Sequence, residues 1–197
     1  MKVIGLTGSI ATGKSTVATF LKDNGISVIC ADALAQELTQ KGQPALKHIA
    51  LIFGLEFLNQ DGTLNRKKLG DLVFNDPDSR DKLNALMHPL VKSELIKQIQ
   101  ILRDKQESLV ILDIPLLYES GFESLCDKII VVYTPETLQK ERLMSRNGYT
   151  EAEALSRIKA QMDIESKKSK ADFVIDNSQD ILTTKKHAKE LLTLLNS

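Results

Sequence analysis

Residues 8–15 read Gly-Ser-Ile-Ala-Thr-Gly-Lys-Ser, and this stretch decides the fold class of the chain. It fits G-x-x-x-x-G-K-[ST], the pattern of a phosphate-binding loop. The apolar run at residues 2–7 predicts a buried strand before the loop, and apolar residues recur at helical spacing over residues 17–21 after it. The motif requires this order of strand, loop and helix, which disfavours the alternative of an accidental glycine-rich turn.

The loop composition predicts a site for ATP with Mg²⁺. Glycines let successive backbone N–H groups converge on phosphate oxygens, and the start of the following helix adds partial positive charge. Lys14 can reach the β- and γ-phosphates, and Ser15 can offer its hydroxyl to Mg²⁺. The residues expected to hold ATP here are Gly8, Ala11, Thr12, Gly13, Lys14, Ser15 and Thr16.

The overall composition is that of an ordinary globular protein of 197 residues, with 42% hydrophobic and 26% charged residues. Lysine plus arginine and aspartate plus glutamate number 26 each, so no general basic field would attract nucleic acid or an anionic membrane. Cys30 and Cys126 make neither a disulfide framework nor a zinc site. No run approaches the roughly 20 apolar residues of a membrane span. We expect a cytoplasmic protein with small-molecule substrates and no obligate protein partner.

Five short apolar runs predict strands, and helical patterns lie between them. This alternation indicates a five-stranded parallel sheet in a three-layer αβα sandwich of the phosphate-loop NTPase type. The predicted strands are residues 3–7, 26–30, 109–114, 128–133 and 173–176. Such sheets bind ligands at the carboxyl ends of their strands, which would collect Asp32, Asp113, Pro115 and Asp176 along one edge with the phosphate loop.

Two helical segments are expected to interrupt a core formed by residues 1–31, 105–134 and 171–197. Residues 32–104 contain no convincing strand and predict a helical subdomain. Residues 135–170 carry charged helices with few large apolar side chains, and they predict a lid that opens easily without ligand.

Local signals set several expected helix boundaries. Asp76-Pro77 is typical of a helix start, and Pro89 predicts a break before a new helix. Asn147-Gly148 predicts a helix end, and Thr150 with Glu153 forms a capping-box pattern. Residues 178–197 predict a terminal amphipathic helix.

Two carboxylates follow predicted strands, and each has two interpretations. Asp113 can serve Mg²⁺, directly or through water, or it can cap the turn after its strand. Asp32 can act as the general base that accepts the proton of an attacking hydroxyl, or it can be a helix N-cap.

Basic residues raise a similar choice. Arg142 and Arg146 share a helix face and can oppose charge on a transferring phosphate, or they can be an ordinary solvated surface. The run Arg66-Lys67-Lys68 and the His88-Pro89 pair can meet an anionic second substrate, but residue type alone does not favour this over a structural role.

In this order, the motifs resemble those of the dephospho-coenzyme A kinase family nearly end to end. The resemblance is carried by the phosphate loop, Ala31-Asp32, Asp61-Gly62-Thr63-Leu64-Asn65-Arg66, His88-Pro89, the run from Asp113 to Glu119, Arg142 with Arg146, and Ile175-Asp176-Asn177. The Pro-Leu-Leu-aromatic-Glu run, the His-Pro pair and the Ile-Asp-Asn ending are its most specific parts. Cys30 and Gln36 depart from the family, in which Asp and Arg are frequent at these positions.

The resemblance implies phosphoryl transfer from ATP to the ribose 3′-hydroxyl of dephospho-coenzyme A. It implies that residues 32–104 bind the acceptor, with Asp32 as the catalytic carboxylate. The other acceptor contacts that it implies are Arg66, His88, Pro115, Leu116, Leu117, Tyr118 and Glu119. Arg142 would be the lid arginine, and Asn177 would lie beside the adenine of ATP.

Two alternatives stay open from the sequence. The first is another small-molecule kinase of the same fold, acting on a nucleoside, a nucleotide or a sugar acid. The second is a nucleotide-dependent switch, although residues 177–180 lack the lysine of the Asn-Lys-x-Asp base-reading motif.

Overall fold

The computed structural model describes residues 1–196, so the last residue of the predicted terminal helix, Ser197, lies outside the described residues. The strands are β1 (Lys2–Gly8), β2 (Ser27–Cys30), β3 (Leu109–Asp113), β4 (Lys128–Tyr133) and β5 (Phe173–Asp176). The helices are α1 (Lys14–Asp23), α2 (Ala31–Leu38), α3 (Pro44–Phe53), α4 (Arg66–Asn75), α5 (Pro77–Asp104), α6 (Glu136–Asn147), α7 (Glu151–Lys159), α8 (Ile164–Ser169) and α9 (Ile181–Asn196), with the 3-10 turns η1 (Leu55–Phe57) and η2 (Phe122–Leu125).

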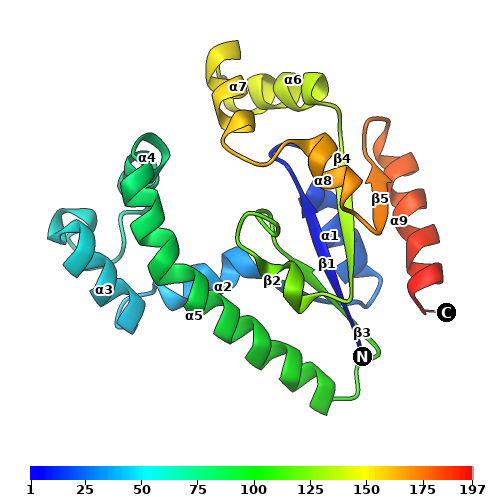
Figure 1. The fold of residues 1–197 in the computed structure, drawn as a ribbon, viewed down its shortest axis with the longest axis horizontal. Coiled ribbons are helices and arrows are strands. Elements are labelled where there is room, and N and C mark those ends of the chain that lie inside the picture. Colours follow the sequence, from blue (N-terminus) through cyan, green and yellow to red (C-terminus); the bar gives the residue numbers. More distant parts are fainter. Residues whose placement is uncertain (197) are drawn as a thin grey trace. The chain divides into compact units, whose positions relative to one another are not determined.

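The five strands form one parallel sheet in the order β2-β3-β1-β4-β5, which confirms the predicted fold class (Figure 1). Their registers align the carboxyl ends: Asp113 of β3 lies opposite Leu6 of β1 and Cys30 of β2. Asp176 of β5 lies opposite Tyr133 of β4. The loops after these strands therefore share one edge of the sheet.

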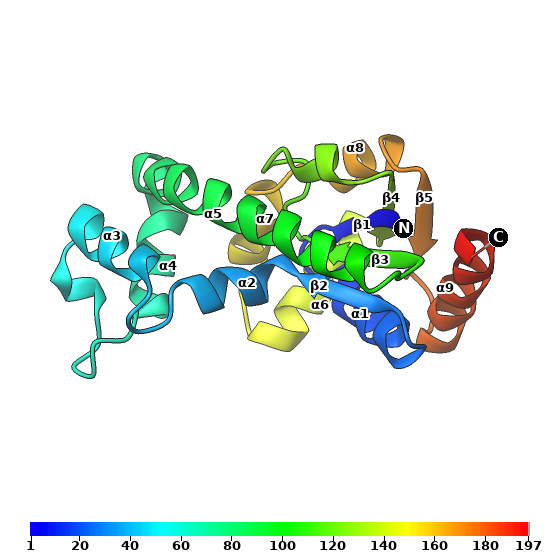
Figure 2. The same cartoon turned by 90° about the horizontal axis from the view of Figure 1, so that it is seen from below.

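Helices cover both faces of this sheet. Figure 2 shows α1 and α9 on one side and α8 on the other. The α1–α9 side encloses a cluster of buried aliphatic side chains from the three middle strands and both helices: Ile4, Leu6, Val17, Leu21, Ile111, Ile130, Val132, Leu191 and Leu192. Burying each of these contributes roughly 1.5–3 kcal/mol, which makes this layer the main apolar core.

The chain divides into two compact units, Met1–Cys30 with Ile99–Ser197 and Ala31–Gln98. The second unit is helical and has its own apolar cluster, formed by Leu46, Ile49, Phe57, Leu64 and Leu69. Its β pairing is limited, among the described residues, to the isolated bridge between Leu58 and Leu64.

One prediction in this region is wrong: Pro89 does not end a helix. α5 runs without interruption from Pro77 to Asp104, with Pro89 inside it. A proline in a helix interior costs about 3 kcal/mol. The next turns bury Val91, Leu95 and Ile99, and burying three such side chains outweighs that cost. The predicted start of α5 is confirmed, because the Asp76 carboxylate accepts a hydrogen bond from the Ser79 N–H at 3.2 Å.

The segment 135–170 contains α6, α7 and α8, and the helix boundaries predicted within it are confirmed. α6 ends at Asn147 before Gly148, whose φ of 68° is left-handed, and Thr150 with Glu153 forms a complete capping box. Few large apolar side chains hold this segment, as expected, but they pack against the phosphate loop. Leu143, Ala154 and Ile158 are buried together, and Ile10 and Ala11 of the phosphate loop pack against them.

No helix within residues 1–196 is both long and apolar enough to cross a bilayer.

Candidate active site

The phosphate loop connects β1 to α1, and its glycines are required by close approaches. Gly13 has a left-handed φ of 85°, and a Cβ there would lie 2.0 Å from Nδ2 of Asn177. A Cβ on Gly8 would lie 2.5 Å from Oγ1 of Thr12.

α1 begins at Lys14 directly after the loop, and the N–H groups of Thr16 and Val17 donate to the carbonyl oxygen of Gly13 at 3.0 Å and 3.4 Å. The N–H groups of Lys14 and Ser15, before them, have no carbonyl one turn earlier in the helix. They are available for an anion.

Lys14 and Asp113 form an ion pair at this edge. The ammonium group of Lys14 contacts Oδ1 of Asp113, and the two side chains are 15% and 10% exposed. Asp113 is the last residue of β3. The structure therefore brings the predicted phosphate-binding lysine together with the predicted metal-binding carboxylate.

Arg142 of α6 reaches back to the nucleotide edge. Its guanidinium donates to the carbonyl oxygen of Asn177 at 2.8 Å, to that of Ala11 at 3.4 Å and to Oγ1 of Thr134 at 3.3 Å. Arg146 is exposed and donates to Oδ1 of Asn147 at 2.9 Å. Only the first of the two predicted arginines thus lies against the phosphate loop here.

Asn177 holds the loop through its side chain. Its Nδ2 donates to the carbonyl oxygen of Thr12 at 2.7 Å, and its Oδ1 accepts from the hydroxyl of Thr184 at 2.6 Å. The hydroxyl of Thr134, just after β4, lies 3.2 Å from the carbonyl oxygens of both Thr12 and Asn177 and can donate its one proton to either. The phosphate loop, the end of β4 and the start of α9 are joined by one polar network.

The run after β3 has mixed exposure. Leu116 is 42% exposed, whereas Leu117 is completely buried. Burial raises the pKa of the Tyr118 hydroxyl to about 12, so the phenol stays protonated at neutral pH. Glu119 pairs with Lys167 of α8 at 2.9 Å. In this run, Leu116 is therefore the side chain best placed to meet a ligand, while Leu117 fixes the course of the loop.

The helical unit has its own cavity, open to solvent, with a volume of about 220 Å³. The lining residues are Ala35, Thr39, Ile49, Leu64, Arg66, Leu69, Gly70, Val73, Leu83 and Met87. Among these lining residues, Arg66 is the one that carries a charge. Its guanidinium donates to the carbonyl oxygen of Gln36 at 3.0 Å and to Oγ1 of Thr39 at 2.8 Å. The cavity is mostly apolar with one cation, which suits an elongated ligand that ends in an anionic group.

Two further predicted residues belong to the helical unit. Asp32 lies in the first turn of α2, which begins at Ala31, so the predicted alternative of an N-cap does not match the helix boundary. Burial lowers the pKa of His88, which keeps its imidazole neutral at pH 7.

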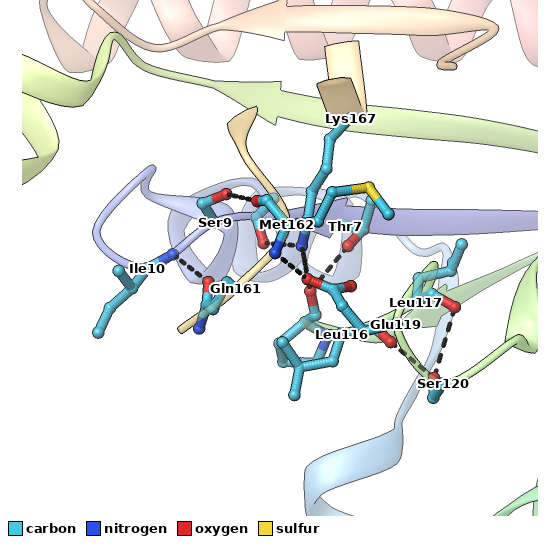
Figure 3. Close-up of polar contacts among 12 residues, drawn as sticks. Thr7, Ser9, Ile10, Leu116, Leu117, Glu119, Ser120, Gln161, Met162 and Lys167 are labelled. Carbon is cyan, nitrogen blue, oxygen red and sulfur yellow. Dashed lines mark hydrogen bonds and ion pairs between the residues drawn. The ribbon is translucent and has the colours of Figure 1, made fainter. Parts of the chain in front are cut away.

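Sequence patterns did not single out Lys167 and Thr134 as site residues. Gln161 accepts a hydrogen bond from the Ile10 N–H of the phosphate loop at 2.9 Å, and Lys167 is completely buried beside the same loop (Figure 3). A lysine in a short polar helix is typical of a surface, so its residue type offered no signal.

Comparison with known proteins gives a consistent result. A family model described as dephospho-CoA kinase matches residues 2–183. The chain is 47% identical over 194 residues to the dephospho-CoA kinase of Listeria monocytogenes serotype 4b. The alignment covers 98% of this chain and 96% of the relative. It is 49% identical over 190 residues to that of Bacillus licheniformis, with 96% and 94% covered.

Solved structures agree. The structure of a dephospho-CoA kinase from Campylobacter jejuni matches with a TM-score of 0.73 at 33% identity, covering 98% of this chain and 96% of that chain. A crystal structure from Thermus thermophilus matches with a TM-score of 0.83 at 34% identity, covering 100% and 98%. A shikimate kinase from Acinetobacter baumannii is 16% identical with a TM-score of 0.57, which shows a shared fold alone.

Proposed function

This chain belongs to the dephospho-CoA kinase family, which catalyses the final ATP-dependent step of coenzyme A biosynthesis, and we propose how its residues divide that work. The reaction moves the γ-phosphoryl group of ATP to the ribose 3′-hydroxyl of dephospho-coenzyme A. The observation that carries the assignment of roles is the Lys14–Asp113 pair at the mouth of the phosphate loop. It sets a cation and a carboxylate where a loop of this type holds the β- and γ-phosphates.

The phosphate loop binds ATP through backbone N–H groups, with Lys14 on the β- and γ-phosphates. In this proposal Lys14 exchanges its bond to Asp113 for bonds to phosphate oxygens. Rotation about the bonds of its long side chain would make this exchange. Lys14 then stabilises the charge that develops on the transferring group.

Mg²⁺ fits the donors beside this loop. Ser15 offers a hydroxyl and Asp113 a carboxylate, which are hard oxygen ligands of the kind that Mg²⁺ prefers together with substrate phosphates. When bound, the ion would neutralise phosphate charge and orient the γ-phosphoryl group. Among residues 1–196 there is no cluster of three or more His, Cys, Asp or Glu side chains for a metal, which suits an ion held largely by its nucleotide.

Asp32 acts as the general base. It lies two residues beyond Cys30, the last residue of β2, so chain length alone keeps the two Cα atoms within about 7 Å. As the acceptor oxygen attacks phosphorus, its proton passes to the Asp32 carboxylate. The new phosphorus–oxygen bond replaces the bond to the β–γ bridging oxygen, and ADP leaves.

Residues 135–170 serve as the lid, and Arg142 is its catalytic cation. Its present bonds to the carbonyl oxygens of Ala11 and Asn177 hold it at the nucleotide edge. Turning toward the γ-phosphate would exchange neutral acceptors for an anion, and charge-assisted bonds are stronger. Arg146 adds positive charge to the same helix, and Asn177 borders the adenine site.

Residues 32–104 bind dephospho-coenzyme A. The apolar cavity of the helical unit receives the extended arm of the acceptor, and Arg66 pairs with its phosphate oxygens. In this proposal the acceptor also contacts His88 of the helical unit and, in the unit built on the sheet, the run from Pro115 to Glu119. The balanced charge of the chain and its small-molecule site fit a cytoplasmic enzyme without nucleic-acid or membrane partners.

A coupled assay of ADP release tests the proposal directly. We expect ADP to appear with ATP, Mg²⁺ and dephospho-coenzyme A, and to fall to a background rate when the acceptor or Mg²⁺ is omitted. Mass spectrometry and phosphorus NMR of the product should place the new phosphate on the ribose 3′-oxygen. Turnover of shikimate or a free nucleoside, with none of dephospho-coenzyme A, would refute the assignment.

A further inference from the structure

Lys167 is a completely buried cation that the reaction scheme does not use. Its ammonium group points toward Glu119 (Figure 3) and lies 2.9 Å from Oε1 of that residue. It also lies 3.2 Å from the carbonyl oxygen of Pro115 and 3.5 Å from that of Gly8. An ammonium group has three N–H donors, and here all three have acceptors. The ammonium group is therefore held in one position. We call Lys167 and its three acceptor residues, Gly8, Pro115 and Glu119, the junction.

The junction joins three separate segments of the chain. Gly8 is the first residue of the phosphate loop, and Pro115 follows Asp113 by two residues. Lys167 comes from α8, in the returning part of the lid. The same oxygen of Glu119 also accepts a hydrogen bond from the Met162 N–H at 2.9 Å, which draws the chain before α8 into the junction.

Neighbouring bonds reinforce the same three segments. The hydroxyl of Thr7 donates to the carbonyl oxygen of Pro115 at 2.9 Å, and that of Ser9 donates to the carbonyl oxygen of Met162 at 3.4 Å. The Ile10 N–H donates to Oε1 of Gln161 at 2.9 Å. Residues 161–167 are thus tied by polar contacts to residues 8–10 and to Pro115. α6 and α7 meet the loop mainly through an apolar cluster, to which Arg142 adds one hydrogen bond with the carbonyl oxygen of Ala11.

A buried ammonium is a poor source of stability, because desolvation offsets much of its attraction to a carboxylate. Apolar side chains of similar volume would fill this position at least as well. What the ion pair adds is direction, since each hydrogen bond fixes an angle and a distance. A directional junction beside the phosphates points to a role in alignment.

We propose that Lys167 is a positioning residue for phosphoryl transfer. Through Gly8 and Pro115 it aligns the entrance of the phosphate loop with the chain that follows Asp113, and through Glu119 it anchors the returning part of the lid to both. Residues 161–169 then stay fixed while α6 and α7 move. This inference rests on the proposed function, because alignment is measured here through transfer to dephospho-coenzyme A.

The test uses four variants of the full chain. Lys167→Met keeps the length of the side chain and removes its charge. Glu119→Gln keeps an acceptor for the Met162 N–H, and the double variant Lys167→Met/Glu119→Gln removes both charges without leaving either one unpaired. Lys168→Met is the matched control, since Lys168 is the next residue of α8 and its side chain is 43% exposed.

We expect Lys167→Met to lower kcat by about 10–100-fold per folded molecule, because a misplacement near 1 Å can cost about 10²-fold in rate. The KM for ATP should rise much less than kcat falls. The double variant should recover the melting temperature lost by Lys167→Met but not its kcat. Amide hydrogen exchange of residues 161–169 should be faster in both, with or without ligands, and Lys168→Met should behave as the wild type.

A purely structural charge pair predicts the opposite pattern. Recovery of kcat together with melting temperature in the double variant would overturn the inference, as would a normal kcat in Lys167→Met. Should Lys167→Met not fold, the double variant is compared with Glu119→Gln: a tenfold lower kcat supports positioning, and equal values overturn it. Absence of acceptor-dependent ADP release in the wild type would instead refute the proposed function, while the exchange data still report whether Lys167 anchors residues 161–169.

Discussion

The unit built on the sheet and the helical unit Ala31–Gln98 differ in what surrounds their candidate ligand sites. At the sheet edge, the phosphate loop is held by directional polar contacts, among them Asn177 with Thr12 and the buried ammonium of Lys167. The cavity of the helical unit is mostly apolar, with Arg66 as its charged lining residue. Directional contacts fix the positions of reacting atoms, whereas apolar contacts tolerate differences in the shape of the ligand.

This difference suggests that the sheet edge determines the rate of transfer and that the helical unit determines the affinity for the acceptor. Substitutions at the sheet edge should change kcat, because alignment matters most in the transition state. Substitutions around the helical cavity should change the KM for the acceptor, because they remove binding that the ground state and the transition state share. Four variants test this division, in order of decreasing expected effect.

Lys14→Ala should have the largest effect. Removing one donor to developing charge costs about 10²–10³-fold, and Lys14 is proposed to serve two phosphates, so we expect a loss of about 10⁴-fold or more in kcat. The far-UV circular dichroism spectrum should stay native. Lys14→Met controls for volume and should be equally inactive. Appreciable activity in either variant would show that the reaction does not use this loop.

Asp32→Asn tests the division between the two units most severely. Asp32 belongs to the helical unit, yet it is proposed to affect kcat. We expect kcat to fall by about 10²–10⁴-fold, as for the loss of a general base. ATP affinity, measured by calorimetry, should be unchanged within about threefold. A variant that is only less stable, with normal turnover per folded molecule, would contradict the catalytic role of Asp32.

Arg142→Ala should lower kcat by about 10–10³-fold, less than Lys14→Ala, because Lys14 still faces the phosphates. The KM for dephospho-coenzyme A should change little, since the proposed contact forms mainly in the transition state. Arg146→Ala should lose less activity, because Arg146 is exposed and bonded to Asn147. Equal losses in the two variants would mean that only the total charge of α6 matters.

Arg66→Ala should have the smallest effect on rate and the clearest one on acceptor affinity. Losing one charge-assisted contact should raise the KM for dephospho-coenzyme A by about tenfold or more, with kcat within about threefold of the wild type. Lys67→Ala, at the exposed neighbouring position, is the control. A drop in kcat with unchanged KM would reverse the assignment of this cavity to binding.

Sequence patterns were most informative where a local rule and the fold agree. Five apolar runs bounded by turns became the five strands, since a parallel sheet covered on both faces needs continuous apolar segments. The phosphate loop was also recognisable, because its glycines answer strict geometric demands such as the approach of Asn177 to Gly13. Pro89 shows the limit: burial of later turns of α5 outweighed a local helix-breaking rule.

The parts that could not be predicted depend on contacts between distant residues. The cluster of Leu143, Ala154 and Ile158 is completed by Ile10 and Ala11, which lie more than 130 positions earlier in the chain. Lys167 is buried because Glu119, Pro115 and Gly8 meet around it, and none of them is its sequence neighbour. Spacing rules apply within one helix or strand, so they do not predict contacts between residues that are far apart in the sequence.

The contact of Asn177 with the phosphate loop has a consequence for engineering. Its amide holds Thr12 while its Oδ1 is held by Thr184 of α9, so the loop is braced by a helix more than 160 residues away. Gly13 and Asn177 also share one small space, which means that a larger residue at either position needs a compensating change at the other. Libraries that randomise only the loop would overlook this partner.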